Sequence, residues 1–162
     1  KGGKWYEGTA DAIYHNLWLL ERSEAKYVMV LSGDHIYRMD YAPMLEEHIA
    51  NNAELTVACM DVNCKEAKAF GVMGIEENNR VHSFVEKPEN QPHLPNIPER
   101  SLVSMGIYIV SMDILQRAVT EDAQIENSSH EFGKDIIPKL IETGTVYAYK
   151  SCGSKGRVDK DC

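Results

Sequence analysis

The chain has 162 residues, of which 43% are hydrophobic and 26% are charged, so its composition is that of one globular domain and excludes intrinsic disorder. The formal net charge of −8 argues against a nucleic-acid partner, and a phosphorylated ligand would need local lysines or a metal ion to offset the negative field. No apolar run is long enough to span a membrane and no leader pattern begins the chain, so we expect a cytoplasmic protein without membrane contacts.

The first half of the chain alternates helical and strand patterns. Apolar residues recur with the helical period from 10 to 22, where Thr9 or Asp11 could cap the first turn. The patterns that follow predict, in order, a strand over 27–32, a helix over 41–51, a strand over 55–60 and a β-hairpin of strands 71–75 and 80–86.

The second half contains a long loop and then resumes the alternation. Four prolines between positions 88 and 98 exclude both a helix and a central strand, and they make 87–100 an extended loop of the length that is often functional. A strand over 101–110 and helices over 113–119 and 135–142 follow, and Gly144 ends the last helix. We expect an α/β fold with a mixed, mostly parallel sheet flanked by helices. Residues 1–150 are expected to form one domain and 151–162 a polar tail.

The end of the 27–32 strand is the most informative position. Gly33 would let the backbone approach a ligand closely, and Asp34 would be the first side chain to leave the sheet. Open α/β sheets bind ligands at the carboxyl ends of their strands, where a carboxylate can hold a divalent metal against phosphates. The alternative interpretation is that Gly33 and Asp34 simply begin a tight turn.

Cysteine usage indicates no metal or disulfide framework. The four cysteines form no CxxC pair and show no zinc-finger spacing with histidines, and Cys59 lies in an apolar strand-like run. We interpret all four as reduced thiols.

Six short motifs occur in an order that is typical of one family. They are WYEGTADA (5–12), SGDHIY (32–37), FGVM (70–73), FVEKP (84–88), SMGIY (104–108) and SSHEFGKDIIP (128–138). Over essentially the whole chain this series resembles the ADP-glucose pyrophosphorylases (glucose-1-phosphate adenylyltransferases) of the bacterial glycogen type. The resemblance implies a Rossmann-like nucleotidyltransferase fold and an activity that joins ATP to glucose 1-phosphate, giving ADP-glucose and pyrophosphate for glycogen biosynthesis.

The resemblance implies roles for three charged residues. Asp34 matches the family aspartate that holds Mg²⁺ against the phosphates, and Lys87 matches the lysine that grips the phosphate of glucose 1-phosphate. Glu86 would accept hydrogen bonds from sugar hydroxyls. Neighbouring strand residues point to opposite faces, so Glu86 and Lys87 can reach one ligand only if the strand ends at this point. Pro88 ends it. Without the family pattern, Glu86 and Lys87 would read as an exposed ion pair worth at most about 1 kcal/mol.

Further contacts are implied by the same resemblance. Gly71 would bring a backbone amide to the sugar ring, and Tyr6 and Ser104 would donate to sugar or phosphate oxygens. A bend at Gly71 and ordinary packing or capping by the two hydroxyls are the alternatives. The resemblance also places a turn near the adenine, formed by Gly8, Thr9 and Ala10. The alternative is that this turn is a simple helix N-cap.

One position departs from the family pattern, and two histidines are given no catalytic role. Glu131 stands where the family usually has Asp, which affects a local cap or contact. His35 and His130 are expected to be structural, because a transfer to phosphate needs no histidine nucleophile.

The resemblance also implies that the chain is one segment of a longer protein. Family members begin with a glycine-rich triphosphate loop and end in a β-helix domain, so we expect an internal segment that is inactive alone and that belongs to a homotetrameric, allosterically regulated enzyme. Two alternatives remain open: a sugar-1-phosphate nucleotidyltransferase that uses UTP or dTTP, and a non-catalytic regulatory subunit.

Overall fold

The computed structural model describes residues 5–33, 39–90, 92–94 and 97–151. Its helices are α1 (Thr9–His15), α2 (Leu17–Arg22), α3 (Ala42–Ala50), α4 (Cys64–Ala67), α5 (Met112–Asp122) and α6 (Ile137–Thr143), the last preceded by a π-helical turn, η1 (Phe132–Ile136). Its strands are β1 (Tyr27–Leu31), β2 (Leu55–Asn63), β3 (Gly71–Ile75), β4 (Val81–Glu86), β5 (Arg100–Ser111) and β6 (Val146–Lys150).

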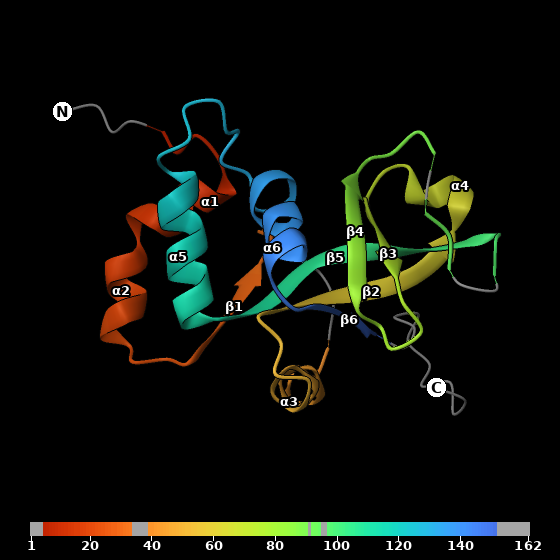
Figure 1. Cartoon of the computed structure of the whole chain (residues 1–162), viewed down its shortest axis with the longest axis horizontal. Coiled ribbons are helices and arrows are strands. Elements are labelled where there is room, and N and C mark those ends of the chain that lie inside the picture. The colour runs from red at the N-terminus through yellow and green to blue at the C-terminus, as the bar shows by residue number, and fades with distance from the viewer. Residues whose placement is uncertain (1–4, 34–38, 91, 95–96, 152–162) are drawn as a thin grey trace.

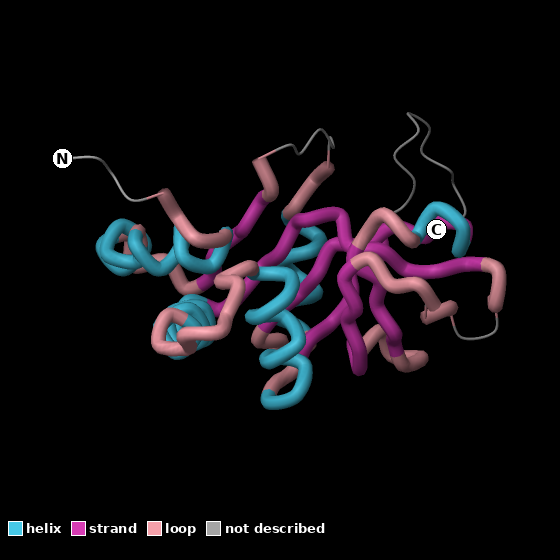
Figure 2. The backbone as a smooth tube through the Cα atoms, turned by 90° about the horizontal axis from the view of Figure 1, so that it is seen from above, coloured by secondary structure: helices cyan, strands magenta, loops and turns pink. Residues whose placement is uncertain are grey.

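The strands form one mixed sheet in the order β4-β3-β5-β2-β6, with β1 paired to β5. Figure 1 shows α1, α2 and α5 at one end of the molecule and the β3–β4 hairpin with α4 at the other. Seen from above in Figure 2, the strands run through the middle and helices flank them. The expected α/β class with a mixed sheet is therefore confirmed.

The expectation that parallel pairs dominate is wrong for the described strands. Only β2 and β6 pair in parallel, whereas β1–β5, β2–β5, β3–β4 and β3–β5 are all antiparallel. The physical reason is the long strand β5, which runs between β1 and β2 in the opposite direction to both. It separates strands that share one direction and would otherwise have made a parallel pair.

Alternating side chains of β2 and β5 fill two cores on opposite faces of the sheet. Leu55, Val57 and Cys59 pack in the larger core with residues of α5 and α6. Ala58, on the opposite face of β2, packs instead with Met44 of α3. This two-sided burial fixes the register of both strands, because a slip of one residue would exchange their faces.

The expected helix over 10–22 is divided into two. The side-chain amide of Asn16 donates to the carbonyl of Ala12 at 2.8 Å, and the Asn16 backbone amide donates to Ile13 at 3.0 Å. A side chain that competes for backbone hydrogen bonds in this way weakens a helix locally. The other expected elements occur within a few residues of their predicted bounds, and strand β6 was not anticipated.

Candidate active-site cleft

A cavity of about 760 Å³ opens where β1 and β4 end. Five segments contribute to its lining: the end of β1 with Ser32 and Gly33, Glu86 and Lys87 at the end of β4, Gly106 and Tyr108 of β5, Glu131 with Phe132 to Lys134 of η1, and Thr9, Ala12 and Ile13 of α1. A smaller cavity of about 340 Å³ shares Glu86, Gly106 and Tyr108 with it and reaches Gly71 and Ser104. We refer to the two together as the cleft.

Glu86 and Lys87 line one cavity although they are neighbours in the sequence. Strand β4 ends at Glu86, and Lys87 has a φ of 47°, in the left-handed region that non-glycine residues rarely adopt. The Lys87 amide donates to the Phe70 carbonyl at 3.0 Å, which holds this turn. Within the described part of the chain the two side chains form no ion pair, so the alternative of an exposed strand-end pair is not found.

A bulge in β5 shapes the floor of the cleft. The register with β2 shifts between Val57 and Cys59, and Gly106, opposite this point, has a φ of 70°. A side chain at Gly106 would collide with the hydroxyl of Ser32, whose amide donates to the Gly106 carbonyl at 3.0 Å. The bulge thus holds Ser32, the residue after β1, at the edge of the cleft. Bulges are frequent beside active sites.

Ser104 and Tyr108 form a hydrogen-bonded pair on this bulge. Ser104 Oγ lies 3.3 Å from Tyr108 Oη and accepts the Gly106 amide at 3.1 Å. Burial is the main reason that the pKa of Tyr108 lies above its usual 10, against an opposing effect of the Ser104 hydrogen bond. The phenol therefore stays protonated at neutral pH and can donate a hydrogen bond to a ligand in the cleft.

Gly71 has a packing role that its sequence context did not reveal. A Cβ atom there would collide with the ring of Phe84 and would lie 3.0 Å from the Glu86 carboxylate. The missing side chain makes room for Phe84, whereas Gly33 has open space where its Cβ would be. The contact between the Gly71 amide and a sugar remains a prediction.

Gly8, Thr9 and Ala10 attach α1 to the segment before η1. Thr9 Oγ1 donates to Glu131 at 2.7 Å and accepts the Phe132 amide at 2.8 Å, while the Ala10 amide donates to His130 at 2.8 Å. A Cβ at Gly8 would collide with the His130 carbonyl. Glu131, the departure from the family pattern, thus makes a real contact. Of the three residues, Thr9 lines the cleft.

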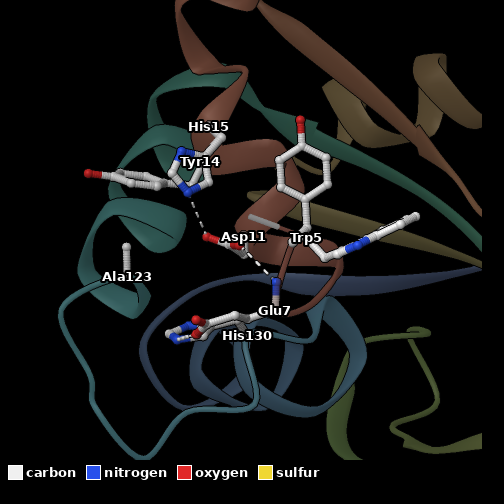
Figure 3. A pocket seen from close by; sticks show the side chains of 8 residues that line it. Trp5, Glu7, Asp11, Tyr14, His15, Ala123 and His130 are labelled. Carbon is white, nitrogen blue, oxygen red and sulfur yellow. Dashed lines mark hydrogen bonds and ion pairs between the residues drawn. The ribbon is translucent and has the colours of Figure 1, made fainter. Parts of the chain in front are cut away.

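Tyr6 lies outside the cleft. It lines a separate pocket of about 420 Å³ with Trp5, Asp11, His15 and His130, and Figure 3 shows the acidic and imidazole groups of this pocket facing one another. Tyr6 Oη accepts a hydrogen bond from Asn16 at 3.3 Å. The structure therefore does not bring Tyr6 together with Glu86 and Lys87, and its ligand contact remains a prediction.

His130 is held in a structural network, in line with its expected role. Its Nδ1 lies 2.8 Å from buried Asp122, which also accepts the Ser128 hydroxyl at 2.6 Å, and its Nε2 lies 3.6 Å from Glu7. The hydrogen bond with Asp122 is the main cause that raises the pKa of His130 above 6.5.

Asp34 and His35 lie outside the described residues. Gly33, the last described residue before them, lines the cleft. Across residues 5–33, 39–90, 92–94 and 97–151, no group of three or more His, Cys, Asp or Glu side chains is arranged to hold a metal. The two cysteines described, Cys59 and Cys64, are free thiols. No helix in the same ranges is long and apolar enough to cross a membrane.

Several cleft residues were not singled out from the sequence. Gly106, Tyr108, Phe132 and Lys134 all occur within quoted motifs, but no pattern of spacing indicated that they meet Glu86 and Lys87. Their positions follow from the β5 bulge and from η1, and neither feature has a sequence signal as clear as a turn or a cap. The motifs themselves were the only available pointer.

A nucleotide-binding class of enzyme fits this geometry, because the cleft lies at strand ends and combines lysines with hydroxyl donors. Residues 2–154 match a family model described as nucleotidyl transferase. The match covers more than half of the chain, and the chain therefore belongs to the nucleotidyl transferase family.

Several curated relatives similar to this chain share one name. The chain is 86% identical to glucose-1-phosphate adenylyltransferase 2 of Vibrio vulnificus (strain YJ016). It is 74% and 68% identical to the proteins of the same name from Vibrio parahaemolyticus serotype O3:K6 and Vibrio cholerae serotype O1. Each alignment covers all 162 residues but 40% of the relative, so the chain spans about two-fifths of the length of these proteins.

Proposed function

We propose that this chain forms the sugar-phosphate side of the active site in an enzyme that transfers the adenylyl group of ATP to glucose 1-phosphate, for glycogen biosynthesis. The observation that carries the proposal is the cleft, where Glu86 and Lys87 line the same cavity as Gly33, the residue before Asp34. The names of relatives 68–86% identical over the whole chain support the same reaction.

In this proposal each described residue has a simple task. Lys87 offsets the charge of the sugar phosphate, Glu86 accepts hydrogen bonds from sugar hydroxyls, and the protonated Tyr108 and Ser104 supply neutral hydroxyl groups. Gly33 leaves the cavity wall open for close approach of a ligand to the backbone. Thr9 lines the cleft at the start of α1, where Gly8, Thr9 and Ala10 are proposed to lie near the adenine. The transfer then depends on positioning and charge neutralisation.

We further propose that Asp34 holds Mg²⁺. Of the described carboxylates in the cleft, Glu131 accepts the Thr9 hydroxyl, and Glu86 is assigned to the sugar in this proposal. This leaves Asp34 as the ligand, and Mg²⁺ usually takes only one or two protein carboxylates. When bound, the metal would neutralise charge on the phosphates. A cytoplasmic homotetramer with allosteric regulation is proposed for the full-length enzyme.

The test is pyrophosphate release by the full-length protein with glucose 1-phosphate and each of ATP, UTP and dTTP. We expect turnover with ATP to exceed that with the other nucleotides by at least about tenfold. Lys87→Gln should raise the KM for glucose 1-phosphate about tenfold or more, as for the loss of a hydrogen bond to a charged group, and Asp34→Asn should abolish most turnover. Preference for UTP or dTTP would favour the alternative nucleotide, and no turnover would favour a regulatory subunit.

Lys26→Gln is the matched control, because it removes the same charge at the opposite end of β1 from the cleft. A KM that rises equally in Lys87→Gln and Lys26→Gln would show that only the overall charge matters.

A further inference from the structure

Lys134 lines the same cavity as Lys87 but has no task in the function proposed above. It comes from η1, a different element from the end of β4, so the cavity receives two lysines from segments 47 positions apart in the sequence. Neighbouring Gly133 lies against Glu86: a Cβ on Gly133 would be 3.6 Å from the Glu86 carboxylate. The η1 turn and the end of β4 are thus adjacent walls of one site.

The ammonium group of Lys134 is not used within the fold. In the described part of the chain it forms no ion pair or side-chain hydrogen bond, whereas Lys139, one turn and a half further on, binds Glu121 at 2.6 Å. The protein has 25 acidic residues against 17 lysines and arginines, so surface lysines have many possible partners. An unpaired lysine facing a cavity is available for an external anion.

The backbone that carries Lys134 is held firmly on both sides. Asp135 accepts the Glu131 amide at 2.9 Å and the Ser129 hydroxyl at 2.7 Å. The buried Phe132 ring packs against Tyr108 with their centroids 5.1 Å apart. A π-helical turn of this kind is rare and occurs frequently at functional sites. The fixed turn therefore presents a flexible four-carbon arm to the cleft.

We infer that Lys134 is a second phosphate-binding cation of the cleft, acting with Lys87 on a phosphate ester or polyphosphate. Two ammonium groups from separate walls can neutralise more of a multiply charged ligand than Lys87 alone, which an acidic protein requires. The identity of the phosphate rests on the proposed function: it belongs either to the sugar phosphate or to the phosphate chain of the nucleotide.

The experiment compares Lys134→Gln, Lys134→Arg and Lys26→Gln in the full-length protein, measuring kcat and the KM of each substrate. We expect Lys134→Gln to raise one KM about tenfold or more and Lys134→Arg to recover most of the affinity, because arginine keeps the charge. A raised KM for glucose 1-phosphate assigns Lys134 to the sugar phosphate, and a raised KM for ATP assigns it to the nucleotide. Both KM values within twofold of the Lys26→Gln control would overturn the inference.

Direct binding separates this inference from the proposed function. If the wild-type protein makes no ADP-glucose, the proposed function fails, and binding of inorganic pyrophosphate measured by calorimetry still tests Lys134. Weaker binding by Lys134→Gln than by Lys26→Gln supports the site, and equal binding contradicts it. Should Lys134→Gln unfold, the resonance of ¹³C-methylated Lys134 in the wild type serves instead: a shift on adding pyrophosphate is expected, and no shift would refute the inference.

Discussion

His48 and His130 occupy opposite electrostatic environments. His48 is 1% exposed and packs edge-on against the Tyr27 ring, and its nitrogens contact hydroxyl groups, with Nδ1 2.7 Å from Thr56 and Nε2 3.3 Å from Ser111. Burial lowers the pKa of His48 below 6.5, whereas the Asp122 carboxylate raises the pKa of His130 above 6.5. The fold therefore favours the neutral form of His48 and the protonated form of His130.

The two histidines should contribute to stability with opposite dependence on pH. The contribution of His130 is fully present below pH 6.5 and is lost as the pH rises through its folded pKa. The contribution of His48 falls as the pH drops below 6.5, because the unfolded chain then binds a proton that the buried ring does not. An NMR titration of the imidazole resonances should place the His130 midpoint above 6.5 and the His48 midpoint below it; the reverse order would contradict both environments.

The packing role of Gly71 can be tested by a single substitution. Gly71→Ala forces a methyl group into the ring of Phe84 and should destabilise the protein by about 1–3 kcal/mol, the usual range for overpacking. Gly33→Ala, which meets open space, should change the free energy of unfolding by less than about 0.5 kcal/mol. Urea denaturation measures both, and equal effects of the two substitutions would argue against the packing role.

Among the contacts between elements, the cleft depends on the one between α1 and η1. Thr9 Oγ1 both donates to Glu131 and accepts from the Phe132 amide, so one hydroxyl fixes the start of α1 to the turn that carries Lys134. These two elements are more than a hundred residues apart in the sequence, and pattern analysis could give each one but not their contact.

Thr9→Val should remove the hydroxyl contact between α1 and η1 at nearly constant side-chain volume. It leaves the Phe132 amide without its acceptor and the Glu131 carboxylate with only the 3.4 Å bond from the Thr9 amide, and we expect a loss of about 1–3 kcal/mol in the free energy of unfolding. Thr120→Val, on the exposed face of α5, should stay within about 0.5 kcal/mol. Thermal and urea unfolding of the pair gives the comparison, and a Thr9 variant as stable as the Thr120 variant would show that the hydroxyl is dispensable.

Local patterns predicted elements better than their pairing. The turn residues between 75 and 81 indicated the β3–β4 hairpin, and Gly144 marked the end of α6, because both signals are local chemistry. The break at Asn16 and the position of β5 between β1 and β2 escaped prediction. The first depends on one side-chain hydrogen bond, and the second on long-range pairing that no window of sequence contains.

At the scale of the molecule, the cleft forms because β5 bulges where β1 ends. Gly106 lets β5 bend toward Ser32, and the same bend carries Tyr108 to the cavity that Glu86 and Lys87 line. The family resemblance implied that Glu86 and Lys87 belong to one site, and both line the same cavity. The sequence could not indicate the place of Tyr6, which the fold assigns to a separate pocket.

The bulge should therefore tolerate no side chain at position 106, which unfolding in urea can test. Gly106→Ala places a side chain at a φ of 70° and against the Ser32 hydroxyl, so we expect about 1–3 kcal/mol of destabilisation. The Gly106→Ala, Ser32→Ala double variant removes the collision but keeps the backbone strain, and it should recover part of the loss. Full recovery or none would contradict this division between collision and strain.

The central claim is that a phosphorylated sugar binds between the end of β4 and the β5 bulge. The most direct measurement is a crystal structure of the full-length protein with glucose 1-phosphate bound. We predict the sugar phosphate in the cleft, with its phosphate at Lys87 and its hydroxyl groups at Glu86. A sugar phosphate seated instead in the pocket of Trp5, Asp11 and His130, with the cleft empty, would contradict the claim.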